Sequence, residues 1–263
     1  MRFATAKLRT GPQIHYAETG ETGGEPVVFL HGWPDSSLSF SRVTPLLPPD
    51  VHTFAIDQRG FGDSDRSETS YGIPDFAADV VSFLDAVSIG RATLVGHSFG
   101  SFVARRVAIS HPERVKRLVL IGTGFSPSNA VTRDVQTSLR GLSDPISPEF
   151  AREFQSSTLY LPLPESFFEG LLAESLKLPA HLWRETFDGL LASDDEQRLS
   201  GILAPTLLIW GEHDALFPRD DQDRVVRSVK GARLIVYRET GHCPNWERPE
   251  RVAADLTAFL RES

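Results

Sequence analysis

The chain has 263 residues, with 27 Lys and Arg against 35 Asp and Glu, so its formal net charge is -8. This acidic balance disfavours binding to nucleic acid or to an anionic membrane surface. The apolar runs are strand-sized, the first residues lack the apolar core of a secretory signal, and the single cysteine excludes an intrachain disulfide. We therefore expect a cytoplasmic protein built as one α/β domain with an inserted segment.

Strand and helix patterns alternate along the first part of the chain. Short apolar runs predict strands at residues 3–8, 13–19, 26–30, 51–56, 92–95 and 115–121. Between them, an apolar stripe with helical spacing predicts a helix at 74–88, and a second helix follows at 99–110. Strands that alternate with helices indicate an α/β fold with a mostly parallel sheet and helices on both faces.

The alternation stops after residue 124. The next stretch shows no strand pattern, and its Pro-punctuated helical segments lie near 129–141, 147–157, 164–177 and 180–192. Alternation returns with a strand at 205–210, a helix at 219–229, a strand at 232–237 and a helix at 248–262. We expect a core formed by residues 1–124 and 201–263, with 125–200 inserted as an all-helical cap.

Ser98 is the candidate nucleophile. It lies in the pattern Gly-x-Ser-x-Gly at residues 96–100, after a predicted strand and before a predicted helix. In that context the motif forms a tight turn that lifts the serine hydroxyl above the sheet. Gly96 and Gly100 lack a Cβ and let neighbouring backbone approach closely. The turn also places Ser98 at a helix N-terminus, where free N–H groups favour developing negative charge.

A serine nucleophile needs a base, and the base needs an acid that orients it. Among the histidines, only His242 sits in a loop between a predicted strand and the last predicted helix. Glu212 and Asp214 both follow the strand at 205–210, and we prefer Asp214 because it lies further along the turn. Ser98, Asp214 and His242 then occur in the chain order expected after such a serine turn.

A tetrahedral intermediate needs two preplaced N–H donors. We assign one to the backbone of Phe99, next to the nucleophile, and the other to Trp33, in the loop after the strand at 26–30. Pro34 offers no N–H and would stiffen this loop, with a cis peptide as one means. The His31 side chain is expected to anchor the loop rather than to carry a proton.

Five segments together resemble the α/β-hydrolase superfamily. They are residues 31–34 (HGWP), 57–64 (DQRGFGDS), 96–100 (GHSFG), 211–214 (GEHD) and 241–242 (GH). The likeness covers both ends of the chain and is greatest to lidded bacterial esterases and cofactor-free perhydrolases. It implies the α/β-hydrolase fold, with an eight-stranded sheet and a helical cap.

The first two of these segments also resemble epoxide hydrolases, the main rival reading. Those enzymes use an aspartate where this chain has Ser98, and a pair of cap tyrosines where this cap has only Tyr160. Haloalkane dehalogenases likewise need a carboxylate at the Ser98 position. The serine therefore favours an acyl-enzyme over an alkyl-enzyme route.

Aromatic residues near the motifs and in the cap predict an apolar substrate pocket. The candidates are Trp33, Phe125, Trp183 and Phe217. Asp35 follows the Trp33 loop and either faces the pocket mouth or caps a helix. No cluster has metal-ligand spacing and no Gly-rich loop suits a phosphate, so we expect neither a metal nor a cofactor.

These features predict a serine hydrolase that cleaves a carboxylic ester or lactone of a small, largely apolar substrate through an acyl-enzyme. Perhydrolase or haloperoxidase chemistry and C–C bond hydrolysis use the same three residues and stay open. A slow-turnover small-molecule receptor on the same fold stays open as well. The expected partner is a small-molecule ester, and no pattern indicates an oligomeric state.

Overall fold

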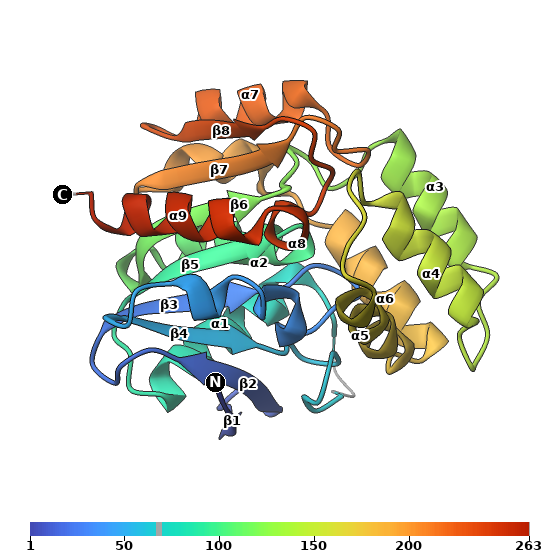
Figure 1. The fold of residues 1–263 in the computed structure, drawn as a ribbon, viewed down its shortest axis with the longest axis horizontal. Coiled ribbons are helices and arrows are strands. Elements are labelled where there is room, and N and C mark those ends of the chain that lie inside the picture. Colours follow the sequence, from blue (N-terminus) through green and yellow to red (C-terminus); the bar gives the residue numbers. More distant parts are fainter. Residues whose placement is uncertain (67–69, 263) are drawn as a thin grey trace.

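The computed structural model describes residues 1–66 and 70–262. Within them, one sheet has the strand order β1-β2-β4-β3-β5-β6-β7-β8 (Figure 1). Its strands are β1 (Arg2–Lys7), β2 (Gln13–Thr19), β3 (Glu25–Leu30), β4 (Val51–Ile56), β5 (Ala92–His97), β6 (Val115–Ile121), β7 (Thr206–Gly211) and β8 (Arg233–Tyr237). β2 is antiparallel to both of its neighbours, and the other pairs are parallel. The predicted eight-stranded, mostly parallel sheet is confirmed.

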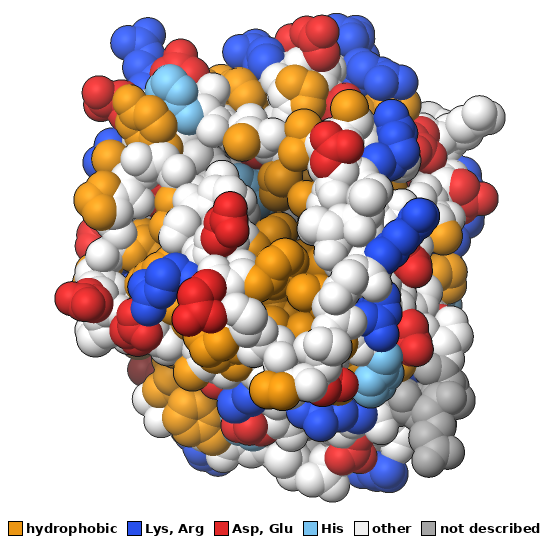
Figure 2. Space-filling model, turned by 90° about the vertical axis from the view of Figure 1, so that its right-hand side faces the viewer, with side chains coloured by type: hydrophobic (Ala, Val, Ile, Leu, Met, Phe, Trp, Pro, Cys, Tyr) orange, Lys and Arg blue, Asp and Glu red, His pale blue; other side chains and the backbone are white. Residues whose placement is uncertain are grey.

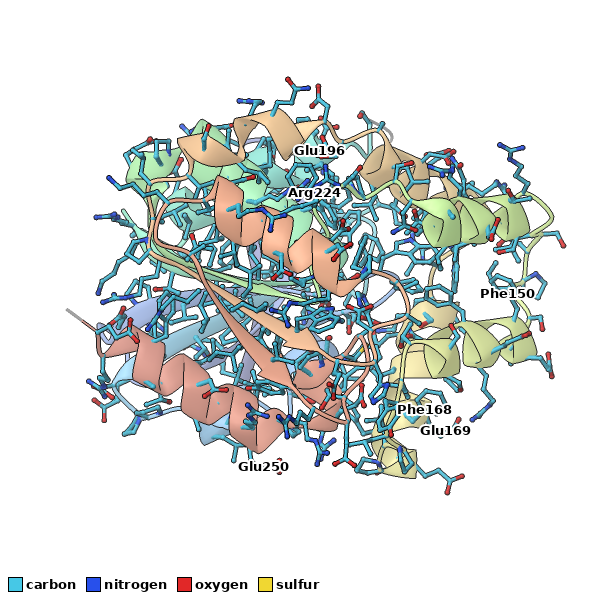
Figure 3. All side chains as sticks on the ribbon, turned by 90° about the horizontal axis from the view of Figure 1, so that it is seen from above. Phe150, Phe168, Glu169, Glu196, Arg224 and Glu250 are labelled. Atoms are coloured by element: carbon cyan, nitrogen blue, oxygen red, sulfur yellow. The ribbon has the colours of Figure 1, made fainter. Side chains whose placement is uncertain are left out.

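Helices cover both faces of this sheet. Successive residues of each strand point to opposite faces, so both faces present apolar side chains that helices bury. Val28 and Leu94 pack with α1 (Ile73–Ala86) and α2 (Phe99–Ser110) in one core. The alternate side chains pack with α9 (Pro249–Leu260) in a second core. Seen from above, Arg224 of α7 (Arg219–Ser228) and Glu250 of α9 lie on opposite sides of the sheet (Figure 3).

Four further helices follow β6 and precede β7. They are α3 (Ala130–Leu139), α4 (Pro148–Ser157), α5 (Glu165–Leu176) and α6 (Ala180–Leu191). They gather beyond the carboxyl ends of the parallel strands, and we call them the cap (Figure 1). Phe150 of α4 and Phe168 of α5 lie on this side of the molecule (Figure 3). None of the described helices has the length and apolar character needed to cross a membrane.

The turn between β5 and α2 requires glycine at two positions. A Cβ on Gly96 would overlap the carbonyl oxygen of Gly100, and a Cβ on Gly100 would overlap the carbonyl oxygen of Leu30 at the end of β3. Both obstacles are backbone atoms, which cannot rotate away as a flexible side chain can. The two glycines therefore let α2 start directly against the sheet.

Replacing Gly100 with alanine is expected to lower the free energy of unfolding by about 2 to 4 kcal/mol, because α2 and β3 must separate to admit the methyl group. Gly90→Ala is the matched control, since a Cβ there meets nothing within 4 Å. Urea denaturation followed by circular dichroism measures both. Equal stability of the two variants would contradict the close approach of α2 to β3.

Candidate active site

Ser98 occupies the turn between β5 and α2 in an unusual backbone conformation. Its φ is +48° and its ψ is -117°, a region that non-glycine residues rarely adopt. The turn is fixed by a hydrogen bond from the Ser98 N–H to the carbonyl oxygen of Ile121 in β6, at 2.8 Å. The Ser98 carbonyl accepts from the N–H of Ser101, also at 2.8 Å. The surrounding structure thus holds a strained residue at the end of β5.

His242 and Asp214 form a buried pair. His242 Nδ1 lies 2.9 Å from Asp214 Oδ2, and the two side chains are 3% and 0% exposed. The other carboxylate oxygen of Asp214 accepts hydrogen bonds from the N–H groups of Leu216 at 2.8 Å and Phe217 at 3.0 Å. Glu212, the alternative acid, is exposed. Asp214 is therefore held so that one oxygen faces the imidazole.

The structure brings Ser98 to the same end of the sheet as this pair. Ser98 and Phe217 line one cavity, and the Phe217 ring lies 5.8 Å from the His242 ring. His242 Nε2 is buried and makes no hydrogen bond, to Ser98 or to any other of the described residues. The nitrogen opposite the Asp214 contact is thus free to accept a proton.

The loop that carries His242 is joined to the cap. The His242 N–H donates to the carbonyl oxygen of Thr158 at 2.9 Å. The carboxylate of Glu247 accepts from the N–H of Gly241 at 2.9 Å and from that of Leu161 at 2.8 Å. The backbone on both sides of the imidazole therefore takes its position from the segment that follows α4.

Two backbone N–H groups near Ser98 lack partners. Phe99 is the first residue of α2, and Trp33 lies in the loop after β3, followed by a cis peptide bond to Pro34. Among the described residues, neither N–H donates a hydrogen bond. Trp33 lines the same cavity as Ser98, and its Nε1 donates to Thr186 Oγ1 of α6 at 2.9 Å. The two N–H groups are thus available to an anionic oxygen beside Ser98.

The cavity above Ser98 is small and apolar. Its volume is about 20 Å³, room for about one water molecule. Besides Ser98, it is lined by Trp33, Thr132, Val135, Phe154, Phe187, Leu190, Leu216 and Phe217. On the cap side of the molecule, hydrophobic side chains gather in a central hollow with charged groups around it (Figure 2).

Two of the four predicted pocket residues lie outside this cavity. Trp33 and Phe217 line it, whereas Phe125 and Trp183 do not. The Trp183 side chain is fully buried and packs in a T-shaped arrangement against the Trp33 ring, with centroids 4.9 Å apart. The Arg224 guanidinium covers the Phe125 ring at 3.7 Å. Trp183 therefore supports the cavity wall from behind, and Phe125 packs under Arg224 instead of lining the cavity.

The model of one known family, described as the alpha/beta hydrolase fold, matches residues 25–249. The chain belongs to the α/β-hydrolase family. It is 32% identical to a 2-hydroxy-6-oxononadienedioate/2-hydroxy-6-oxononatrienedioate hydrolase of Burkholderia vietnamiensis, over 95% of this chain and 91% of that protein. It is 30% identical to a 2-hydroxy-6-oxo-6-phenylhexa-2,4-dienoate hydrolase of Comamonas testosteroni, with the same coverage. An esterase from Exiguobacterium antarcticum has the same fold, with a TM-score of 0.90, 22% identity and coverage of 99% and 100%.

In this α/β hydrolase, His31 fixes the Trp33 loop to Gln58, in the turn after β4. His31 Nε2 accepts from the N–H of Gln58 at 3.0 Å, and the Gln58 side-chain amide donates to the His31 carbonyl at 3.0 Å. Burial lowers the pKa of His31 to about 4, so the imidazole is neutral at pH 7. The geometry matches the expected anchoring of the loop.

Asp35 joins the same loop to the cap from a buried position. Its Oδ1 accepts from the Gln155 side-chain amide of α4 at 3.0 Å, and that amide also donates to Ser175 Oγ of α5 at 2.9 Å. Asp35 does not cap a helix, because Ser36 caps the short helix that follows. Burial raises the pKa of Asp35 to about 7, although the Gln155 hydrogen bond opposes the shift.

This raised pKa makes stability depend on pH. Between about pH 4 and 7, the unfolded chain releases the Asp35 proton and the folded chain keeps it, so stability falls as pH rises through this window. Asp35→Asn is expected to remove about 2 to 4 kcal/mol of that fall. Urea unfolding at pH 4.5 and 7.5 measures the difference against Asp134→Asn, an exposed control. Parallel pH profiles for the Asp35 variant and the parent would contradict the prediction.

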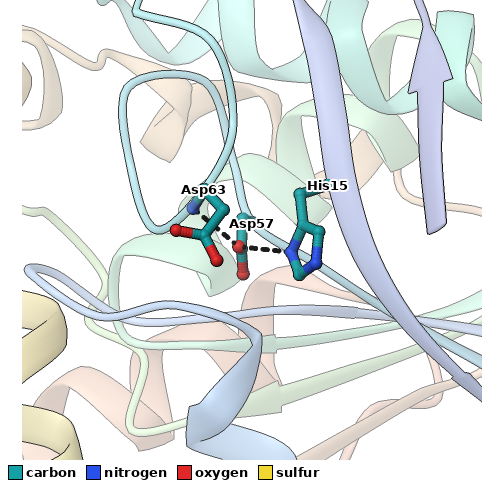
Figure 4. A group of neighbouring side chains, drawn as sticks. All are labelled: His15, Asp57 and Asp63. Atoms are coloured by element: carbon teal, nitrogen blue, oxygen red, sulfur yellow. Dashed lines mark hydrogen bonds and ion pairs between the residues drawn. The ribbon is translucent and has the colours of Figure 1, made fainter. Parts of the chain in front are cut away.

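A cluster of possible metal ligands among the described residues joins His15 of β2 to two aspartates that follow β4. His15, Asp57 and Asp63 offer ligand atoms within 4.8 Å of one another (Figure 4). Asp57 Oδ2 contacts His15 Nδ1 at 2.8 Å and accepts from the Asp63 N–H at 3.0 Å, and its Oδ1 accepts from the Ser37 N–H at 2.7 Å. Asp63 in turn pairs with Lys177 at 2.8 Å. Protein donors thus satisfy these carboxylates, and the cluster braces the turn after β4.

Proposed function

We propose that the chain is a serine hydrolase in which Ser98, His242 and Asp214 act as nucleophile, base and orienting acid. The supporting observation is the buried His242–Asp214 hydrogen bond of 2.9 Å, which leaves His242 Nε2 without a partner, while Ser98 lies in a strained turn and shares a cavity with Phe217, whose ring is 5.8 Å from that of His242. In this arrangement the carboxylate fixes the imidazole tautomer that accepts a proton at Nε2.

The reaction begins when Ser98 Oγ attacks a carbonyl carbon of the substrate while His242 Nε2 takes the hydroxyl proton. The N–H groups of Trp33 and Phe99 then stabilise the negative oxygen of the tetrahedral intermediate. His242 returns the proton to the leaving group as its bond to the acyl carbon breaks. Water, deprotonated by His242, attacks the acyl-enzyme and releases the acid and free Ser98.

The sequence relatives favour a carbon leaving group, the alternative to the ester that the serine motif leaves open. The substrate in the name of the Comamonas testosteroni protein contains a ketone and a carboxylate but no ester, so its hydrolysis must break a C–C bond. The electron pair then passes to the departing carbon, which takes the proton from His242. The same serine, base and N–H donors would act in the cleavage of this C–C bond.

The cavity supports a neutral acyl group, which an ester, a lactone or a ketone can each supply. Its lining contains no Lys or Arg among the described residues, so it suits a neutral acyl group. An ester or lactone supplies such a group with an oxygen leaving atom, which needs no conjugated system to accept the electron pair.

Steady-state assays with two substrates distinguish C–C bond hydrolysis from ester hydrolysis. One is 2-hydroxy-6-oxo-6-phenylhexa-2,4-dienoate and the other is p-nitrophenyl butyrate, each with a Ser98→Ala control. Repeated turnover of the dienoate assigns C–C hydrolysis, and turnover of the ester alone assigns ester hydrolysis. A single burst without a steady state would indicate a receptor, and rates equal to the Ser98→Ala control on both substrates would overturn the proposal.

A further inference from the structure

We propose that this site selects uncharged carbonyl substrates and rejects those with a carboxylate near the scissile bond, an inference that rests on the proposed function. The first observation is the lining of the cavity. Its cap residues are Thr132, Val135, Phe154, Phe187 and Leu190, none of which carries a charge. A carboxylate placed among them would lose its hydration without gaining an ion pair.

The polar groups of the lining are already used within the protein. Thr132 Oγ1 donates to the carbonyl oxygen of Pro127 at 2.9 Å and accepts from the Asn129 N–H at 2.9 Å. The Trp33 indole N–H donates to Thr186. Apart from Ser98 and the two N–H groups assigned to the reacting oxygen, the described lining has no donor left for a carboxylate.

The cations of the lining helices are also held elsewhere. Arg133 of α3 donates to Ser128 Oγ at 3.2 Å, and Arg184 of α6 donates to the Leu142 carbonyl at 2.8 Å. Arg152 of α4 pairs with Glu169 on the outer surface of the cap, where both side chains are 50% exposed. No described helix that lines the cavity therefore turns a guanidinium toward Ser98.

A nearby buried carboxylate increases the penalty for an anion. Asp214 contacts His242 with 0% of its side chain exposed. The whole chain carries a formal charge of -8. A second carboxylate would thus meet like charge in a site that screens it poorly.

Two esters of equal length test the proposal. Methyl p-nitrophenyl succinate is neutral, whereas p-nitrophenyl hydrogen succinate carries a carboxylate at the same distance from the reacting carbonyl. We expect kcat/KM for the neutral ester to be at least about 100-fold higher. Values within about threefold would overturn the proposal while leaving the serine mechanism intact. Hydrolysis of neither ester above the Ser98→Ala rate would instead refute the ester mechanism, and this inference with it.

A charge-supplying variant gives a second, independent measurement. Val135 lines the cavity from α3 and is only half-buried, so a lysine there can keep its ammonium hydrated. Val135→Lys is expected to raise the preference for the charged ester at least about 10-fold relative to Val135→Met, which has similar length and no charge. An unchanged preference in the folded lysine variant would overturn the assignment of selectivity to this lining.

Discussion

Replacing Ser98 with alanine is expected to lower kcat/KM by about 10⁴-fold or more, because the other hydroxyl of the described lining, Thr132 Oγ1, is held by the Pro127 carbonyl and the Asn129 N–H. The fold should persist, since alanine keeps the N–H that donates to the Ile121 carbonyl at 2.8 Å. Steady-state kinetics on a substrate accepted by the parent measure the loss, and circular dichroism checks the fold.

Ser110→Ala provides the matched control for this variant. Ser110 ends α2, the helix that begins after Ser98, and its side chain is exposed. Its removal is expected to leave kcat/KM unchanged. A fluorophosphonate probe should label the parent and Ser110→Ala at one site and leave Ser98→Ala unlabelled. Full activity or full labelling of Ser98→Ala would eliminate the proposed nucleophile.

The second large effect is expected for Asp214→Asn, a change that preserves shape and removes charge. The introduced amide would keep its carbonyl oxygen toward the N–H groups of Leu216 and Phe217, from which Asp214 Oδ1 accepts at 2.8 and 3.0 Å. The NH₂ of that amide would then face His242 Nδ1 and donate to it, which forces the imidazole proton onto Nε2. That tautomer accepts no proton from Ser98, so kcat should fall by about 10³- to 10⁴-fold in steady-state assays.

Glu212→Gln distinguishes this effect from a general loss of negative charge. Glu212 lies on the same turn, is exposed, and makes no side-chain hydrogen bond among those described. The change should alter kcat less than about twofold. If Glu212→Gln lost activity and Asp214→Asn kept it, the acid would have been assigned to the wrong residue.

Local signals were sufficient to predict the elements that flank the site. The cap helix α3 begins after Asn129, whose side chain accepts from the Thr132 N–H, and α4 begins after Ser147, which accepts from the Phe150 N–H. Both helices lie within the predicted segments. The four-residue helix α8 (Pro244–Glu247) was not predicted, because it is too short to show an apolar period.

The motifs located the candidate catalytic residues, whereas they gave little information on the lining of the cavity. Gly-x-Ser-x-Gly and its neighbouring loops combine a local conformation with a fixed chain order, which a single sequence displays. The direction of a cap side chain depends instead on how helices pack, so Phe154 and Leu190 were missed and Trp183 was misplaced. The Asp35–Gln155 contact joins residues 120 positions apart and leaves no local pattern.

The His242 loop donates to the Thr158 carbonyl, and the N–H groups of Tyr160 and Leu161 donate to Glu247 of α8, so the loop of the proposed base is fixed to the segment that follows α4. Exchanging the cap between relatives would therefore change the position of the His242 backbone as well as the substrate-binding surface. A chimera with a foreign segment in place of residues 158–161 would have to place its own backbone carbonyl where that of Thr158 accepts from the His242 N–H. Engineering of specificity should therefore keep residues 158–161 and vary α3 and α6, which line the cavity.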